Sequence, residues 1–168
     1  MDTFDTIRTV LAVRQFRDTP IPDDAVRQIV EAGHLTASGG NVQPWHFIVV
    51  RNKDTLQRLG ALARTGPYIA QAPLAVVVAT ERTPLAVSDA SRAIQSMILA
   101  AWSQGIGSNW VGVRGLDSIK PLLGVPDDID LLAIVPFGYP AEARNAGKKN
   151  RKPLGEVAHR ERFGQPFE

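Results

Sequence analysis

The segment that decides the fold reads Ala37-Ser38-Gly39-Gly40-Asn41-Val42-Gln43-Pro44-Trp45-His46-Phe47-Ile48-Val49-Val50. Its glycines can adopt positive φ angles, and they let the backbone approach a ligand closely. Pro44 has no N–H and pushes Gln43 toward an extended conformation, so a strand should begin at this point. Residues 47–50 are too few for a helix and are typical of a strand. The segment therefore predicts a polar loop at a sheet edge, whose donors would suit a planar heterocycle with imide-like edges.

An alternative interpretation of the same segment is a tight turn with a core tryptophan. Trp45 needs one partner for its N–H and otherwise packs well, so we expect it in the core rather than against a ligand. We interpret His46 in the same way, as a structural residue.

The composition indicates a single domain without disulfides. The 168 residues support one domain, which we take to span residues 1–168. No run reaches the ~18 apolar residues of a membrane span, and the acidic segment Met1-Asp2-Thr3-Phe4-Asp5 is unlike a signal peptide. The chain has no cysteine, and its three histidines lie too far apart in sequence for a local metal motif. We therefore expect a cytoplasmic protein with neither a metal site nor a membrane partner.

Basic residues gather near the C-terminus. Between Arg144 and Arg162 there are seven Lys and Arg against two Glu, whereas the rest of the chain has 12 Lys and Arg against 15 Asp and Glu. A basic tail on a mildly acidic body suggests either an anionic ligand or nucleic acid. Because no nucleic-acid motif accompanies this tail, we expect no nucleic-acid partner. A solvated charge run is the other alternative.

Helical and strand patterns alternate irregularly along the chain. Apolar residues from Phe4 repeat at helical spacing and predict a helix that ends near Arg14–Phe16. A second helix should begin after Pro22, where two aspartates suit the positive end of a helix dipole. Further helices are expected at residues 53–62, 88–105 and 116–123. Strands are expected at residues 47–50, 74–79, 108–113 and 131–137.

This order of elements predicts an α+β fold rather than regular βαβ units. No Gly-x-Gly-x-x-Gly lies between a strand and a helix, so the sequence offers no Rossmann dinucleotide site. The long helix at residues 88–105 is apolar or small on most sides, which indicates burial by its neighbours or by a partner chain. Residues 141–168 form an extended basic tail with too few apolar residues to fold alone, so we expect it to lie across the body or on a partner.

Four segments together resemble the nitroreductase family of FMN-dependent oxidoreductases. Residues 38–47 match the family's Ser-x-x-Asn-x-Gln-Pro-Trp-x-Phe, and residues 105–112 are similar to its Leu-Gly-x-Gly-Ser-x-Trp-x-Gly. Residues 13–16 match the end of Arg-Arg-Ser-x-Arg-x-Phe. The closing Gly-Tyr-Pro and Lys-x-Arg-x-Pro-Leu correspond to residues 138–140 and 149–154. The resemblance implies a mixed, mostly antiparallel sheet flanked by helices, in a homodimer with FMN at the interface.

The resemblance also implies which residues meet the flavin ring. The opening loop would approach it from the neighbouring subunit through Ala37, Ser38 and Gly39. Asn41 would hydrogen-bond near the pyrimidine or ribityl side. The backbone of Gly112, with Val111 beside it, would face flavin N5, the atom that accepts hydride. A backbone donor there requires no titratable side chain.

For the FMN phosphate the resemblance implies three cations: Arg14, Lys149 and Arg151. Charge-assisted bonds to a phosphate are about twice as strong as neutral ones. The chain departs from the family at Val10 and Ala12, where the leading Arg and the Ser of the motif are expected. This departure removes one charge and one hydroxyl from the expected phosphate site. Arg8, one turn earlier, and the basic tail are candidates to replace part of them.

The implied activity is ping-pong hydride transfer. Reduced NAD(P)H would deliver hydride to flavin N5 and leave, and a nitroaromatic, quinone or similar electron-poor acceptor would take its place. Larger family members insert helices over the flavin between the equivalents of Ala79 and Ser88, and this chain has no room for them. A non-catalytic flavin-binding or storage protein is the alternative. A further alternative is membership of a branch of the family that consumes flavin or reduces a halogenated substrate.

Overall fold

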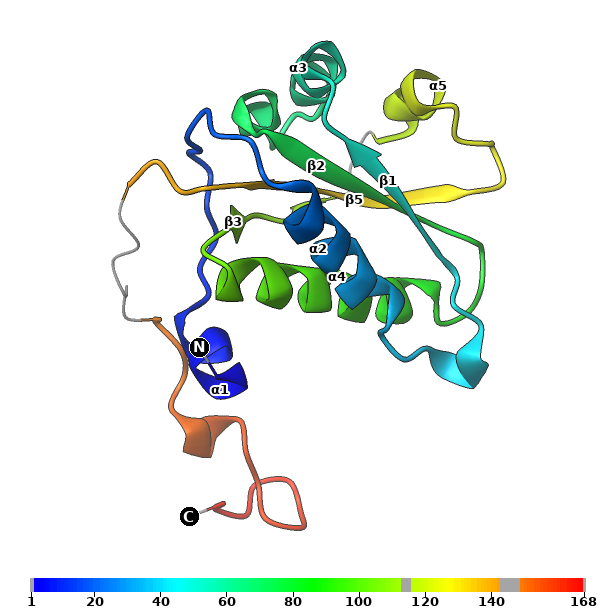
Figure 1. Ribbon diagram of the computed structural model, residues 1–168. Helices are drawn as coiled ribbons and strands as arrows, with labels where there is room; N and C mark the ends of the chain where they lie inside the picture. The colour runs from blue at the N-terminus through cyan, green and yellow to red at the C-terminus, as the bar shows by residue number, and fades with distance from the viewer. Residues whose placement is uncertain (1, 113–115, 143–148, 168) are drawn as a thin grey trace.

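A five-stranded sheet lies at the centre of the molecule, in a computed structural model that describes residues 2–112, 116–142 and 149–167 (Figure 1). The strand order is β1-β2-β5-β3, β4 also pairs with β5, and each of these pairs is antiparallel. One isolated parallel bridge joins Ala12 to Ser108 at the edge. The predicted mixed, mostly antiparallel sheet is thus present. The strands are β1 Trp45–Val50, β2 Leu74–Thr80, β3 Gly107–Ser108, β4 Val111–Gly112 and β5 Asp130–Gly138.

Helices cover both faces of this sheet (Figure 1). The α-helices are α1 Thr3–Thr9, α2 Asp23–His34, α3 Lys53–Leu62, α4 Ala86–Ser103 and α5 Lys120–Leu123. The 3₁₀ turns are η1 Gly39–Asn41, η2 Pro67–Gln71, η3 Leu116–Ile119 and η4 Leu154–Glu156. Capping explains two of the helix starts, because Asp2 accepts the Asp5 N–H at 2.7 Å and Asn52 accepts the Thr55 N–H at 3.0 Å.

Strand β2 divides the core into two layers, because successive side chains point to opposite faces. Val76 and Val78 pack with α2 and α4, whereas Ala75 and Val77 pack with α3 and η2. All seven residues of β2 are buried, as the sequence predicted for this strand. Trp45 belongs to the first layer with 7% of its surface exposed, which confirms its predicted place in the core. His46 lies exposed on β1, with Nε2 3.6 Å from Glu81 Oε1.

Helix α1 ends at Thr9, so the prediction of a helix reaching Arg14–Phe16 was wrong. The following residues are extended and pair with the sheet. The Val13 N–H donates to the Ser108 carbonyl at 2.8 Å, and Phe16 forms an antiparallel bridge with Pro140. Backbone pairing with distant residues therefore overrides the helical spacing of the side chains.

The strand expected at residues 108–113 is interrupted. Strands β3 and β4 flank Asn109 and Trp110, and residue 113 lies outside the described residues. Both short strands keep the same register against β5, and this register would place Asn109 opposite Pro136. Pro136 has no N–H to donate, which explains the break in the ladder.

The described part of the tail, residues 149–167, extends away from the body beyond α1 (Figure 1). It exposes apolar side chains, with Leu154 at 58%, Val157 at 60% and Phe163 at 93% of their surface. Lys149 contacts α1 through a hydrogen bond from Nζ to the Ile7 carbonyl at 2.5 Å. No helix in the described residues is long and apolar enough to span a membrane.

Candidate functional site

Strand β4 carries Gly112, the residue expected beside the flavin ring. Pairing with Ala133 of β5 holds Gly112 in place, and its carbonyl accepts a hydrogen bond from Thr65 Oγ1 at 3.4 Å. A Cβ atom at this position would lie 2.8 Å from Nε1 of Trp110. A larger residue would therefore force the indole to move, because the indole occupies the space that a side chain at position 112 would need.

Val111 faces the opposite way. Its side chain is 2% exposed and packs in the layer formed by α3 and η2. It also touches Gly66, where a Cβ atom would lie 2.6 Å from Val111 Cγ1. Only the backbone of Val111 is thus available to a ligand on the Gly112 side.

Arg14 lies on the extended segment that follows α1. The hydrogen bond between Val13 and Ser108 holds this segment against β3, and Val13 fills the space beside Gly107, where a Cβ atom would lie 2.5 Å from Val13 Cγ2. Arg14 itself is exposed, and it has no ion pair or hydrogen bond within the described parts of the chain. The structure therefore brings Arg14 to the same sheet edge as the β3–β4 segment.

Lys149 and Arg151 lie close enough to influence one another at the end of α1. Burial lowers the pKa of Lys149 below the ordinary value of 10.5, and the like charge of Arg151 lowers this pKa further. Lys149 is bonded to a backbone carbonyl, and Arg151 Nη1 donates to the Asn150 carbonyl at 3.1 Å. Neither cation has a carboxylate partner among the described residues. Arg8 does, because its Nη2 lies 2.9 Å from Asp5 Oδ1.

The opening loop, residues 37–43, has an unusual backbone. Gly40, Asn41 and Gln43 all have positive φ angles, of 57°, 57° and 54°. The loop is closed by hydrogen bonds from the Asn41 N–H to the Ser38 carbonyl at 3.1 Å and from the Gln43 N–H to Ser38 Oγ at 2.9 Å. Ala37 is exposed, and the side chain of Asn41 has no partner in the described part of the chain.

The backbone N–H of Gly39 in this loop is hydrogen-bonded to a side chain of the same chain. Its N–H donates to both carboxylate oxygens of Asp89, at 3.2 and 3.1 Å. A Cβ atom at Gly39 would collide with Cδ1 of Leu85. The Gly39 N–H is thus already used, so Ser38 and Asn41 are the loop residues with polar side chains left for a ligand.

Helix α4 separates the predicted site residues into two groups. The loop is bonded to Asp89 in the first turn of α4, whereas Trp102 in the last turn donates from Nε1 to Thr9 Oγ1 of α1 at 3.0 Å. The rise between Asp89 and Trp102 is roughly 20 Å at about 1.5 Å per residue. Figure 1 shows η1 near one end of α4, and β3 and α1 near the other. One chain therefore brings Arg14 and Gly112 to the β3–β4 edge of the sheet, whereas the loop with Ser38 and Asn41 leads into β1 at the opposite edge.

Sequence reasoning missed two polar contacts near these groups. Asp89 was placed only at the start of a helix, and nothing in the sequence links it to Gly39, 50 positions away. The buried side chain of Asn109 donates from Nδ2 to the hydroxyl of Tyr68, which joins the β3–β4 segment to η2. A polar residue inside a Gly-rich strand was the available signal for Asn109.

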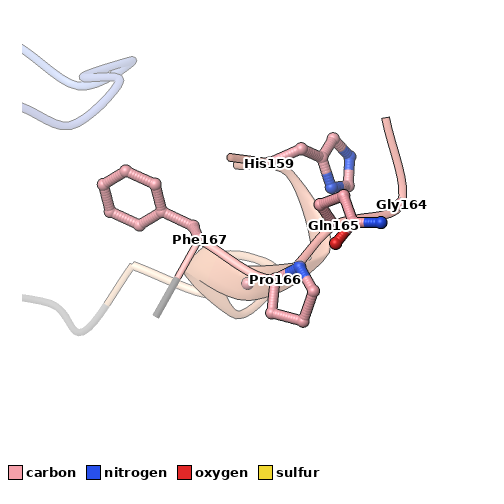
Figure 2. A pocket seen from close by; sticks show the side chains of 6 residues that line it. His159, Gly164, Gln165, Pro166 and Phe167 are labelled. Carbon is pink, nitrogen blue, oxygen red and sulfur yellow. The ribbon is translucent and has the colours of Figure 1, made fainter. Parts of the chain in front are cut away.

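Two hollows lie outside the predicted site. Figure 2 shows the smaller, about 190 Å³, formed within the tail by His159 and residues 164–167 together with Gly155. The larger, about 530 Å³, lies between Phe16, the start of α3 and the end of η2. Neither contains a predicted site residue. Within the described residues, no three His, Asp or Glu side chains gather as they would around a metal ion.

Comparison with known proteins gives consistent matches. The profile described as "Nitroreductase family" matches residues 8–83 and 64–139. A protein of Methanothermobacter thermautotrophicus, provisionally named NADH dehydrogenase/NAD(P)H nitroreductase, is 34% identical over 151 residues, covering 84% of this chain and 79% of its own.

Two solved structures resemble the whole chain. The first is a protein of Bacteroides thetaiotaomicron with the same provisional name, at a TM-score of 0.88 and 26% identity, covering 96% of this chain and 98% of its own. The second is a provisionally named nitroreductase of Desulfovibrio desulfuricans in complex with FMN, at a TM-score of 0.85 and 29% identity. This match covers 97% of this chain and 98% of the other chain. The predicted family and fold are thereby confirmed, and the chain belongs to the nitroreductase family.

Proposed function

We propose that this protein is an FMN-dependent NAD(P)H oxidoreductase that works as a homodimer. The observation that carries the proposal is the division of the predicted FMN residues between two sheet edges, because the loop leads into β1 at one edge whereas Gly112 and Arg14 lie at the β3–β4 edge. A second copy related by a two-fold axis would place the loop of one chain beside Gly112 and Arg14 of the other. Two equivalent sites would result, each built from both chains.

The cations at the tail and sheet edge fit an FMN phosphate. Lys149 and Arg151 are neighbours of like charge, and Arg14 has no partner among the described residues. Such cations are stabilised by a dianionic phosphate, and guanidinium groups bind phosphate through paired N–H donors. This supports the assignment of these cations to the phosphate, although Val10 and Ala12 supply no further donors.

The surface at β4 fits the flavin ring. Gly112 has no side chain, Val111 is directed into the core, and the indole of Trp110 lies against the position that a Cβ atom of residue 112 would take. These residues would let a planar ring approach the backbone and would hold a backbone group against N5. When bound, FMN supplies the redox chemistry, taking hydride from NAD(P)H and passing it to a nitroaromatic, quinone or similar acceptor in a ping-pong sequence.

The connection between β2 and α4 is short. It comprises residues 81–85, and Arg82 binds it to Asp130 with Nη2 2.9 Å from Oδ1. No helix of this chain is therefore inserted between these two elements. We infer that the partner chain or water covers the flavin there, and that the enzyme accepts a broad range of flat, electron-poor substrates.

The proposal is tested by the visible spectrum of the purified protein. We expect a yellow protein whose flavin absorbance is bleached anaerobically by NADH or NADPH and returns when a quinone or nitroaromatic is added. A yellow protein that neither nucleotide bleaches would instead be a flavin-binding or storage protein. A colourless protein that takes up no added FMN would overturn both functions.

A further inference from the structure

The proposed hydride transfer assigns no role to Asp89, a buried carboxylate. Asp89 is 1% exposed and lies in the first turn of α4. Its two oxygens accept the Gly39 N–H, and Arg92 Nη2 lies 2.5 Å from Oδ1. A buried charge is unfavourable unless it is paired and hydrogen-bonded. Arg92 neutralises this charge, although half of its side chain is exposed. The Gly39 N–H supplies the hydrogen bonds that the buried carboxylate needs.

The loop that Asp89 binds has a conformation that its own sequence does not favour. Asn41 and Gln43 have positive φ angles, which residues other than glycine rarely adopt. Such residues persist where the surrounding structure holds them, and they cluster at ligand sites. The bond between Gly39 and Asp89 attaches the middle of this loop to a rigid helix, next to the packing of Gly39 against Leu85.

We propose that Asp89 is a positioning residue for flavin binding. Its carboxylate holds Gly39 so that the loop is already formed before the flavin bound by the partner chain arrives. Ser38 then presents a hydroxyl that can still donate while it accepts from Gln43, and Asn41 presents its amide. Because a preformed loop loses no conformational freedom on binding, the bond at Asp89 increases flavin affinity without touching the flavin. This inference rests on the proposed function, because the flavin must be present for its binding to be assisted.

The chain offers a matched control on the same helix. Ser96 lies two turns beyond Asp89, and its hydroxyl accepts a hydrogen bond from Thr36 Oγ1 at 2.8 Å. This bond also connects the segment after α2 to α4. Thr36, however, precedes the loop of residues 37–43 and is not part of it. Ser96→Ala therefore removes one connection to α4 and leaves the loop anchor intact.

The test compares Asp89→Ala, Asp89→Asn and Ser96→Ala as full-length proteins freed of flavin, by titration with FMN and with riboflavin. We expect Asp89→Ala to lower the affinity for both flavins by about tenfold or more. A loss of about 1.4 kcal/mol in binding free energy corresponds to a factor of ten. We expect Asp89→Asn, which can still accept the Gly39 N–H, to stay within about threefold of the wild type, on the same scale. Ser96→Ala should bind both flavins as the wild type does.

Equal flavin affinity in Asp89→Ala and Ser96→Ala, with only a lower melting temperature in Asp89→Ala, would overturn the inference. A wild-type protein that binds no flavin would instead overturn the proposed function. Hydrogen exchange in the wild-type protein provides a second measurement that does not depend on the folding of a variant. The hydrogen-bonded amides of residues 39 and 41–43 should be protected before flavin is added. Protection that appears only with flavin would mean that the loop is not preformed.

Discussion

At the scale of single residues, the candidate site depends on cations without carboxylate partners and on glycines that fit against particular side chains. Arg14 and Arg151 are exposed, whereas Lys149 is partly buried and bonded to the end of α1. Lys152, the next residue of the tail, is exposed and has no contact of this kind within the described residues. These differences lead to two predictions about the phosphate.

Truncation of each phosphate cation should weaken FMN binding. We expect Arg14→Ala, Lys149→Ala and Arg151→Ala to lose about 1.5–3 kcal/mol, the range for hydrogen bonds to charged groups, with the exposed arginines near the lower end. The loss should shrink as salt is added, because exposed charges are screened. Lys152→Ala is the control. If all four variants bind FMN equally well in fluorescence titrations, the tail is only a solvated charge run.

The lowered pKa of Lys149 predicts a dependence on pH. Lys149 binds phosphate only while protonated, so FMN affinity should fall as the pH rises through its pKa, which lies below 10.5. Lys149→Arg should remove this fall, because arginine stays charged. Riboflavin, which has no phosphate, is the control ligand and should show no such difference between the two proteins. An identical pH profile for FMN in wild type and Lys149→Arg would contradict the prediction.

At the scale of elements, β4 and α4 determine where the parts of the site lie. At β4, the indole of Trp110 occupies the space that a side chain at position 112 would need, so we expect only glycine to fit there. Helix α4 separates the loop at Asp89 from the edge near Trp102. The first feature is a contact between residues two positions apart, whereas the second depends on contacts between α4 and distant segments.

Gly112→Ala tests the packing at β4. The new methyl group would lie against the indole nitrogen of Trp110, so we expect a loss of about 1–3 kcal/mol in stability and slower flavin reduction. The second change Trp110→Phe removes that nitrogen, and it should restore part of the reduction rate. Stopped-flow reduction by NAD(P)H measures the rate, and denaturant unfolding measures the stability. A double variant no faster than Gly112→Ala would show that this contact does not set the position of the backbone.

Sequence patterns predicted those elements whose side chains alone decide their structure. The bounds of α3 agree with the predicted residues 53–62, and β2 is apolar on both faces as its composition indicates. Prediction failed for residues 10–16, where the bond between Val13 and Ser108 competes with helical spacing. The contact between Asp89 and Gly39 is equally invisible, because it depends on how two distant segments meet. The roles of Gly112, Arg14 and the other site residues stay predictions, since they concern a ligand and a second chain.

At the scale of the whole molecule, one chain leaves several large apolar side chains of α1 and the tail exposed. Phe4 and Ile7 of α1 are 72% and 47% exposed, and the tail adds Leu154, Val157 and Phe163. Contiguous exposed apolar residues usually mark an interface. They lie on α1 and the tail, two segments joined by the bond from Lys149 to Ile7, so we expect the surface that would bury them to belong to the proposed two-chain site.

We therefore predict an obligate homodimer. Sedimentation at micromolar concentration should give a dimer mass, and the melting temperature should rise with protein concentration because association stabilises the folded state. A folded monomer at that concentration, with a melting temperature independent of concentration, would contradict the prediction.

The placement of the loop and the cations at opposite ends of α4 has a genetic consequence. A chain with a defective loop and a chain with defective phosphate cations would each form inactive dimers with themselves. In a mixed dimer, one site would combine both defects, while the other would receive the sound loop of one chain and the sound cations of the other. Random pairing of equal amounts gives about half mixed dimers, and so about a quarter of wild-type sites. Two alleles that each encode an inactive protein should thus restore part of the activity when both are expressed in one cell.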